Sequence, residues 1–322
     1  MRAVQAVRAG GPEVLEAVEL ARPAPGPGQV LVRHEAIGLN YIDTYQRSGL
    51  YPTRYPAVLG QEGAGIVEAV GDDVSRFAPG DRVAYTGSLG AYAEFNAVPA
   101  ARAVALPESV SAEIAAAALL KGMTTEFLVR RCYPLKAGET ILVHAAAGGV
   151  GSLLVQWAKA IGATVIGTVG SEGKAVLARE LGCDHVVLYR HEDVAARVKE
   201  ITGGAGVSVA YDAVGKDTFE ATLASLGRRG VFVSFGNASG PAPAVEPLRL
   251  MRGGSLFLTR PTMADYTATL EELDESAGQL FAMIASGKLR IEIGQRFPLA
   301  DARQAHEALE GRQTIGATVL LP

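Results

Sequence analysis

The sequence predicts an α/β protein that combines a doubly wound parallel β-sheet with a smaller, mostly antiparallel β domain. Short apolar runs alternate with helical segments from residue 140 to about residue 259, which is the pattern of a parallel sheet covered by helices on both faces. Proline and glycine interrupt short alternating strands before residue 122, as in antiparallel domains. A chain of 322 residues is also longer than one average domain.

The wound sheet begins at residue 140, and its elements follow in order. Each apolar run is almost continuous, as in strands that are buried on both faces. We expect strands at 140–145, 163–169, 185–189, 208–214, 230–235 and 255–259, and helices at about 150–161, 173–181, 192–201 and 217–225.

The antiparallel part is predicted from alternating runs such as 29–38 and 63–71. The alanine-rich segment 111–131 then supplies helices that lead into the wound sheet. Residues after about 262 return to helices and strands that are separate from that sheet, so we expect them to rejoin the first part of the chain.

Composition and charge exclude several classes of function. The formal charge is −4 and there is no long Lys/Arg run, so nucleic acid is not expected as the main partner. The N-terminal residues lack the apolar core of a secretory signal, and His144 and Gln156 interrupt the uncharged stretch 140–158, which argues against a membrane span. The two cysteines have no CxxC spacing. We therefore expect a cytoplasmic protein.

Residues 145–151, AAAGGVG, form a glycine-rich turn between the first strand and the first helix of the wound sheet. This context is the one that a Rossmann dinucleotide fingerprint requires, although Ala146 stands at the first glycine position. The glycines permit a tight turn and remove Cβ atoms that would hold a pyrophosphate away, and the helix start offers free N–H groups. We therefore predict that a dinucleotide binds at Ala147, Gly148, Gly149, Val150 and Gly151.

The end of the second strand decides between NAD and NADP. An NAD enzyme usually has Asp or Glu there to bind the ribose 2′-hydroxyl, whereas this strand ends in Thr168, Val169, Gly170 and Ser171. Lys174 lies one turn into the next helix, where its ammonium can meet a 2′-phosphate. Glu172 would take the acidic role if the turn were longer. The pattern favours NADPH.

Two long stretches of the chain resemble a known family. GETILVHAAAGGVGSLLVQWAK at 138–159 is similar to the signature of the zeta-crystallin-like quinone oxidoreductases, within the medium-chain dehydrogenase/reductase superfamily. GQEGAGIVEAVGDDV at 60–74 is similar to the catalytic-domain signature of that superfamily. The resemblance implies a GroES-like catalytic domain at 1–122, a Rossmann domain at 123–261, and a C-terminal segment at 262–322 that returns to the catalytic domain.

The chain departs from the zinc alcohol dehydrogenases of this superfamily at two positions. Those enzymes carry His where this chain has Gln61 and Cys where it has Ile42. Neither side chain is a zinc ligand, and no cluster of four cysteines exists for a second metal site. We therefore expect no metal, and we interpret Glu62 as a structural or ion-paired residue. The resemblance then implies NADPH-dependent reduction of a quinone, by hydride or electron transfer.

The resemblance also implies roles for individual residues. The stretch AIGLNYIDTYQRSGLYP at 36–52 matches the family's active-site segment, which places the catalytic residues Asn40, Tyr45 and Tyr51 beside the nicotinamide and the substrate. Their side chains would donate hydrogen bonds to quinone oxygens as charge develops. Beyond the glycine-rich turn, the expected cofactor-binding residues are Tyr41, Ile42, Asp43, Thr124, Gly170, Ser171, Lys174, Tyr189, Phe235, Gly236, Asn237, Ser239, Arg260 and Arg312.

Other interpretations stay open at this point. An enone, alkenal or enoyl reductase of the same superfamily would use the same NADPH site to reduce a carbon–carbon double bond. Members of the family can also serve as lens proteins or bind AU-rich RNA. The net negative charge of this chain argues against RNA as its main ligand. His144 is interpreted as a hydrogen-bonded buried imidazole and Cys132 as a small buried hydrophobe. The exposed edge expected at 255–259 predicts a homodimer.

Overall fold

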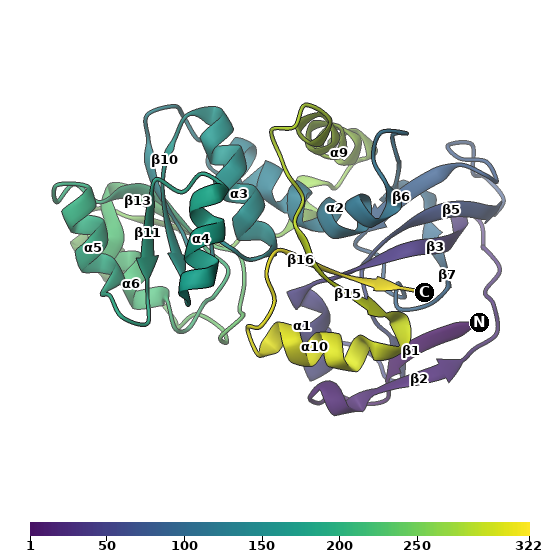
Figure 1. The fold of residues 1–322 in the computed structure, drawn as a ribbon. Helices are drawn as coiled ribbons and strands as arrows, with labels where there is room; N and C mark the ends of the chain where they lie inside the picture. The colour runs from purple at the N-terminus through teal and green to yellow at the C-terminus, as the bar shows by residue number, and fades with distance from the viewer. The chain divides into compact units, whose positions relative to one another are not determined.

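The computed structural model describes residues 1–322, and the chain divides into two units (Figure 1). The first unit contains Met1–Met123, Thr267–Ser286 and Ile291–Pro322, and the second contains Thr124–Tyr266 and Gly287–Arg290. The first unit therefore draws its residues from both ends of the chain. None of the helices has the length and apolar character that a membrane span requires.

The second unit is built on a six-stranded parallel sheet with the order β11-β10-β9-β12-β13-β14. The chain adds β10 and β11 on one side of β9 and then crosses to the other side for the remaining strands. The order therefore reverses between β9 and β12, and ligands of open α/β sheets bind at such a switch point. The strands are β9 (Thr140–Val143), β10 (Thr164–Val169), β11 (His185–Leu188), β12 (Val207–Asp212), β13 (Leu226–Ser234) and β14 (Phe257–Thr259).

Helices follow these strands and bury their apolar residues against them. One core cluster joins Leu142 of β9, Ile166 of β10, Ala210 of β12 and Phe232 of β13 with Phe219 of α6. This arrangement confirms the wound α/β sheet that the alternation of apolar runs predicted. The helical segments are the π-helix η3 (Leu128–Cys132) and the α-helices α3 (Gly149–Ile161), α4 (Glu172–Glu180), α5 (Val194–Ile201), α6 (Phe219–Ser225), α7 (Pro247–Arg252) and α8 (Met263–Tyr266).

Two element boundaries differ from the expectation for physical reasons. Helix α5 begins at Val194 and not at about residue 192, because the carboxylate of Asp193 accepts a hydrogen bond from the N–H of Ala196 at 2.8 Å and caps the helix there. Strand β13 begins at Leu226, before the apolar run at 230–235, because Leu226 already pairs with Val207 of β12; the register then shifts around Arg229, whose backbone is left-handed with φ 62°.

The first unit contains a seven-stranded sheet and a three-stranded sheet. The larger has the order β15-β16-β3-β5-β6-β8, with β7 also paired to β3, and the smaller has the order β2-β1-β4. Every pair is antiparallel except β15 with β16, which confirms a mostly antiparallel domain. The strands are β1 (Arg2–Ala6), β2 (Leu15–Glu19), β3 (Gln29–Leu39), β4 (Ala57–Val58), β5 (Glu62–Val70), β6 (Arg82–Thr86), β7 (Phe95–Pro99), β8 (Ala103–Ala105), β15 (Ile293–Pro298) and β16 (Ala317–Leu321).

The C-terminal strand completes the larger sheet. Strand β16 pairs with β3, with Val319 opposite Gly38 and Leu320 opposite Ile37, and α10 lies beside α1 (Figure 1). The end of β3, which Asn40 directly follows, is therefore held by β16. The helices that start in this unit are α1 (Tyr41–Ser48), α2 (Ala112–Phe127), α9 (Leu270–Ala285) and α10 (Ala302–Glu310), with short turns η1 (Pro12–Val14), η2 (Ala100–Arg102) and η4 (Leu299–Asp301).

Candidate functional site

The glycine-rich turn lies at the switch point of the parallel sheet, between the end of β9 and the start of α3. Gly148 precedes the first residue of α3 with an extended backbone (φ −86°, ψ 178°) and offers no side-chain acceptor to the first helical turn. The N–H groups of that turn therefore present the positive end of the helix dipole, as an anion site requires. The predicted Ala147 is buried, whereas Gly148, Gly149 and Val150 are half-exposed.

Gly151 is also required for close packing between the turn and α3. A Cβ atom at this position would lie 2.2 Å from the carbonyl oxygen of Ala145, and Ala145 itself has a left-handed backbone with φ 53°. The glycine thus lets α3 approach the turn that precedes it. Gly151 is buried and serves the packing of this helix, while its contact with a pyrophosphate stays a prediction.

The segment Phe235–Ser239 follows β13 and docks on the loop that follows β12. The N–H of Phe235 donates to the carbonyl oxygen of Asp212 at 2.8 Å, and the N–H of Ser239 donates to that of Val214 at 2.8 Å. A Cβ at Gly236 would lie 2.4 Å from the carbonyl oxygen of Ala213. The predicted residues Phe235, Gly236, Asn237 and Ser239 are therefore at the carboxyl edge of the sheet, next to the end of β12.

His144 at the end of β9 is a hydrogen-bonded buried imidazole, as expected. Its Nδ1 lies 3.0 Å from Oγ1 of Thr168 and its Nε2 lies 3.0 Å from Oγ1 of Thr222. Thr222 also donates to Oδ2 of Asp212 at 3.1 Å. Burial lowers the pKa of His144, and Asp212 opposes this effect. The imidazole ties β9, β10 and α6 together beneath the glycine-rich turn.

The end of β10 carries the residues expected to bind the adenosine phosphate. The N–H of Tyr189 donates to the carbonyl oxygen of Val169 at 3.2 Å, and a Cβ at Gly170 would lie 2.5 Å from the Tyr189 hydroxyl. Residue 170 must therefore be small for Tyr189 to cover the strand end. Ser171 is the exposed residue that precedes α4, and Lys174 is half-buried in the first turn of that helix.

In the first unit, the predicted active-site segment begins directly after β3. The rings of Tyr41 and Tyr45 lie 6.3 Å apart, and the rings of Tyr45 and Tyr51 lie 5.3 Å apart in an edge-to-face arrangement. The N–H of Tyr51 donates to the carbonyl oxygen of Tyr45 at 3.0 Å. Tyr45 is 8% exposed, while Tyr51 is half-buried. The structure therefore brings these three tyrosines into one cluster at α1.

Asn40 lies against a buried ion pair whose lysine the sequence did not indicate. Its Nδ2 donates to Oε2 of Glu62 at 2.7 Å, and Nζ of Lys121 reaches the same oxygen at 3.2 Å. This confirms Glu62 as an ion-paired residue. Lys121 lies in the alanine-rich helix α2, where a single lysine among apolar residues was the only available signal.

Asp43 belongs to a second buried network, which joins α1 to α10. Oδ2 of Asp43 accepts hydrogen bonds from the N–H of Asn40 and from the Tyr92 hydroxyl, both at 2.9 Å. Nε2 of His306 donates to the Tyr92 oxygen at 2.9 Å, since its Nδ1 accepts from Arg47 at 2.9 Å. Arg47 is 2% exposed and pairs through two nitrogens with Glu310. No sequence motif connects these residues.

The pKa values of Asp43 and His306 in this network are shifted in opposite directions. Burial raises the pKa of Asp43 to about 7, and burial together with the Arg47 charge lowers the pKa of His306 to about 3. His306 is therefore neutral near pH 7, with its hydrogen on Nε2. The network fixes the start of α1 and the side chains that α1 carries.

The remaining predicted residues are divided between the two units. Thr124 is half-buried on α2, and Arg260 is exposed just after β14. Arg312 is exposed after α10, with a left-handed backbone of φ 57°. Ile42 and Gln61, the positions of zinc ligands in related dehydrogenases, are both half-buried. No group of three or more His, Cys, Asp or Glu side chains is arranged to hold a metal ion.

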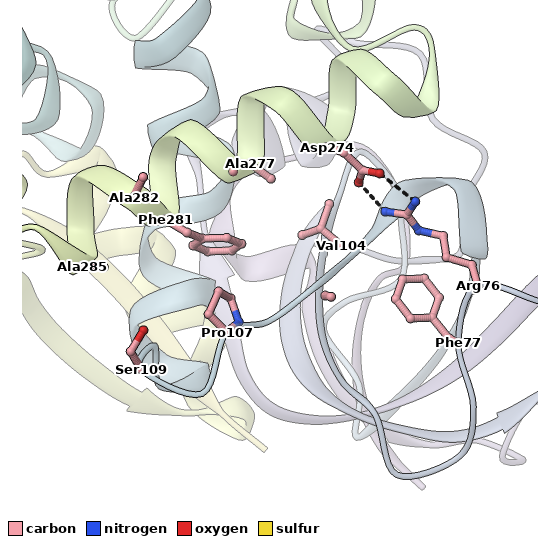
Figure 2. A pocket seen from close by; sticks show the side chains of 12 residues that line it. Arg76, Phe77, Val104, Pro107, Ser109, Asp274, Ala277, Phe281, Ala282 and Ala285 are labelled. Atoms are coloured by element: carbon pink, nitrogen blue, oxygen red, sulfur yellow. Dashed lines mark hydrogen bonds and ion pairs between the residues drawn. The ribbon is translucent and has the colours of Figure 1, made fainter.

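A cavity of about 640 Å³ opens in the first unit between α9 and the segment around β8 (Figure 2). Phe281, Val104 and Phe77 line it, and the ion pair between Arg76 and Asp274 borders it. None of the predicted site residues lines this cavity, so we assign it no part in the activity.

Comparison with known proteins identifies the family. Residues 26–108 match the family model described as "Alcohol dehydrogenase GroES-like domain", and residues 149–278 match the one described as "Zinc-binding dehydrogenase". The quinone oxidoreductase of Pseudomonas aeruginosa is 54% identical over 99% of this chain and 99% of its own length. The 2-haloacrylate reductase of a Burkholderia species is 43% identical over 97% of this chain and 96% of its own length.

A solved structure extends this similarity to the fold. The Escherichia coli quinone oxidoreductase complexed with NADPH is 48% identical, with a TM-score of 0.98 and coverage of 100% of both chains. Sequence and fold therefore agree over the full length, as the motifs at 60–74 and 138–159 predicted. This chain belongs to the quinone oxidoreductase family of the medium-chain dehydrogenase/reductase superfamily.

Proposed function

We propose that this chain is an enzyme that reduces quinones with NADPH. The observation that carries the proposal is its full-length similarity to quinone oxidoreductases, at 54% identity to the Pseudomonas enzyme. The glycine-rich turn at the switch point supports it, because that is where a Rossmann sheet binds a dinucleotide. We further propose that the second unit binds the cofactor and that the first unit carries the residues that act on the acceptor.

Three groups of residues in the second unit would hold NADPH. The turn at 147–151 suits the pyrophosphate, because the start of α3 presents N–H groups there. Phe235–Ser239 suits the nicotinamide half, because it lies at the carboxyl edge of the sheet. Gly170, Ser171, Lys174 and Tyr189 suit the adenosine phosphate. The strand tip has no carboxylate for a ribose 2′-hydroxyl, and the similar Escherichia coli enzyme was solved with NADPH.

When bound, NADPH supplies the hydride or the electrons that reduce the acceptor. Gln61 and Ile42 cannot serve as zinc ligands, so positioning and hydrogen bonding must supply the catalysis that zinc supplies in alcohol dehydrogenases. A quinone oxygen gains negative charge during the reduction and is stabilised by a fixed hydroxyl donor. We assign this role to Tyr45 and Tyr51, whose edge-to-face contact restricts the motion of both rings.

The proposal is tested by following NADPH oxidation with 1,4-benzoquinone. Tyr45→Phe and Tyr51→Phe should slow turnover more than they weaken NADPH binding, whereas Tyr133→Phe should leave turnover unchanged. Tyr133 is a matched control because its hydroxyl donates to Glu139 and has no part in the proposed site. Turnover at the wild-type rate in both active-site variants would remove these tyrosines from the mechanism, and a wild-type protein inactive with quinones would overturn the proposed function.

A second candidate is reduction of a carbon–carbon double bond. The full-length similarity to a 2-haloacrylate reductase favours it, at 43% identity. Such a reaction must protonate the carbon next to the one that receives the hydride, so an acid such as Tyr51 would matter more than it does for a quinone. Comparing kcat/KM for 1,4-benzoquinone and for a 2-enal distinguishes the two, and a higher value for the enal would reverse our ranking.

We also propose that the protein forms a homodimer through the edge of its parallel sheet. Strand β14 is the last strand of that sheet, and Phe257 and Leu258 are 60% and 37% exposed. Leu248 and Met251 on the neighbouring helix α7 are 46% and 58% exposed. An apolar sheet edge of this kind is normally covered by a partner. Light scattering should give twice the chain mass, and a monomeric mass would reject the dimer.

The cytoplasm is the compartment that we propose. Cys132 and Cys183 are free thiols in the structure, which suits a reducing environment. Fractionation of the source cells should recover the activity with other cytoplasmic proteins, and recovery with secreted proteins would contradict this assignment.

A further inference from the structure

Glu62 is a fully buried carboxylate with three hydrogen-bond donors around it. Its Oε2 accepts from Nδ2 of Asn40 at 2.7 Å and from Nζ of Lys121 at 3.2 Å, and its Oε1 accepts from the N–H of Leu120 at 2.7 Å. The side chains of Glu62 and Lys121 are 0% and 6% exposed. A buried charge persists only when it is paired and hydrogen-bonded, so every one of these contacts restrains the carboxylate.

The backbone around Glu62 is shaped to admit this carboxylate. A Cβ atom at Gly38 would lie 2.2 Å from Oε2 of Glu62 and 2.2 Å from the carbonyl oxygen of Ala116. Any larger residue at position 38 would displace the carboxylate or α2. Strand β3, strand β5 and helix α2 thus converge on one pair of oxygen atoms, and Asn40 follows directly after β3.

The carboxylate decides which way the amide of Asn40 faces. A carboxylate accepts hydrogen bonds and donates none, so Nδ2 of Asn40 must face Glu62, and the second N–H points toward the carbonyl oxygen of Gly38 at 3.5 Å. The amide oxygen is then turned away from Glu62. This orientation differs from the role of hydrogen-bond donor that the sequence suggested for Asn40.

We propose that Glu62, neutralised by Lys121, is a positioning residue that makes Asn40 a hydrogen-bond acceptor toward the bound reactants. The inference rests on the proposed function and on the role that the family resemblance implies for Asn40, which is to lie beside the nicotinamide and the substrate. The group recognised by Asn40 is then an N–H or O–H donor. It is either the carboxamide of the nicotinamide or a hydroxyl of the forming hydroquinone. Lys121 contributes the charge that allows the carboxylate to stay buried.

The variant Glu62→Gln tests the orientation directly. Oε2 also accepts from Nζ of Lys121, so every variant at position 62 named here also carries Lys121→Met, which removes that donor. The N–H of Leu120 then keeps the glutamine oxygen at the position of Oε1, so the amide nitrogen faces Asn40 and forces the Asn40 amide to invert. We expect kcat/KM for 1,4-benzoquinone, measured per NADPH-binding site, to fall at least about tenfold. Adding Asn40→Asp to this variant should restore at least about fivefold, because the aspartate accepts from the introduced glutamine with one oxygen and offers the other to the reactants.

The matched control is Glu68→Gln, on the same strand β5. Glu68 pairs with Arg22 and Arg33 and its side chain is 35% exposed, so its removal should leave kcat/KM within about twofold of wild type. A purely structural role for Glu62 would lower stability and the number of NADPH-binding sites but leave the turnover of each site unchanged. It would also give no recovery in the double variant.

Each outcome decides the proposal. Turnover of Glu62→Gln within about threefold of wild type, or a double variant no better than either single variant, would overturn it. If Glu62→Gln does not fold, the kcat/KM of the variant that combines Glu62→Gln with Asn40→Asp is compared with that of Asn40→Asp alone, and it must be the higher of the two. Failure of every variant at position 62 to fold, with Glu68→Gln folded, would assign Glu62 to stability only. An inactive wild-type protein would overturn the proposed function instead.

The same measurements identify the donor that Asn40 accepts from. If it is the carboxamide, NADPH binds more weakly to Glu62→Gln, and the Kd recovers in the double variant. If it is the hydroxyl of the hydroquinone, the NADPH Kd stays at the wild-type value and only kcat with the quinone changes.

Discussion

Asp43 makes the stability of the first unit depend on pH. Its side chain is 0% exposed, and Oδ2 accepts from the N–H of Asn40 and from the Tyr92 hydroxyl, while Oδ1 has no partner. Burial raises the pKa of Asp43 from 3.8 to about 7, and these two hydrogen bonds, with the charge of Lys121, only partly oppose it. The Glu62 charge adds to the increase.

The sign of the pH dependence follows from this higher pKa. Between pH 3.8 and about 7 the folded protein holds a proton on Asp43 that the unfolded chain has lost, so the free energy of unfolding falls as the pH rises through this window. Each tenfold change in proton affinity is worth ~1.4 kcal/mol, so Asp43 should lower the free energy of unfolding by up to about 4 kcal/mol. Below this window the loss is absent, and above it the loss is complete.

Asp43→Asn should remove this loss. The amide oxygen can keep both hydrogen bonds of Oδ2, and the new buried Nδ2 costs about 1–3 kcal/mol at every pH. Urea unfolding followed by circular dichroism, from about pH 4.5 to about pH 8, measures the difference between variant and wild type. The free energy of unfolding of Asp43→Asn, relative to wild type, should increase as the pH rises. The same substitution at the exposed Asp72 should give no such increase. Parallel curves for wild type and Asp43→Asn would refute the reasoning.

Three further predictions follow from single contacts. Tyr92→Phe removes the hydroxyl between Asp43 and His306 and should lower the free energy of unfolding in urea by about 1–3 kcal/mol; an unchanged value would show that the hydroxyl is dispensable. Gly151→Ala should weaken NADPH binding at least about tenfold by fluorescence titration, because its Cβ would lie 2.2 Å from the Ala145 oxygen; wild-type affinity would show that the turn can move without cost. Lys174→Ala should lower the preference for NADPH over NADH by about tenfold, and an unaltered affinity ratio would remove Lys174 from the 2′-phosphate site.

Local sequence patterns were sufficient to predict the parallel sheet. The strand at Thr140–Val143, the glycine-rich turn and the helix at Gly149–Ile161 are adjacent in the chain, so the period of apolar residues and the position of the glycines describe them directly. The environment of His144 was predictable for the same reason. A histidine that ends an apolar strand is buried, and a buried imidazole needs hydrogen-bond partners.

The reason for an individual glycine was less predictable. A glycine at position 151 is compatible with a close ligand and with a close backbone, and the sequence does not separate the two. The carbonyl oxygen of Ala145, a residue with a left-handed backbone, shows that the backbone comes close at this position. Only the backbone path of the turn contains this information.

The network of Asp43 and the ion pair of Glu62 lay beyond sequence reasoning. His306 makes two hydrogen bonds in this network. One joins it to Tyr92, 214 positions earlier in the chain, and the other joins it to Arg47, 259 positions earlier. Lys121 is 59 positions from Glu62. No periodic pattern connects residues at such distances, so the role of each side chain depended on which strands and helices the fold brings together.

The sequence by itself determined the wound sheet, the antiparallel domain and the family, because these depend on burial patterns and motifs that are continuous along the chain. Tertiary structure decided which way the Asn40 amide faces and over which pH range Asp43 holds a proton. Both are set by hydrogen bonds and charges from distant segments, at Glu62, Lys121 and Tyr92. A side chain's orientation and its pKa are properties of its surroundings, and those surroundings exist only once the chain has folded.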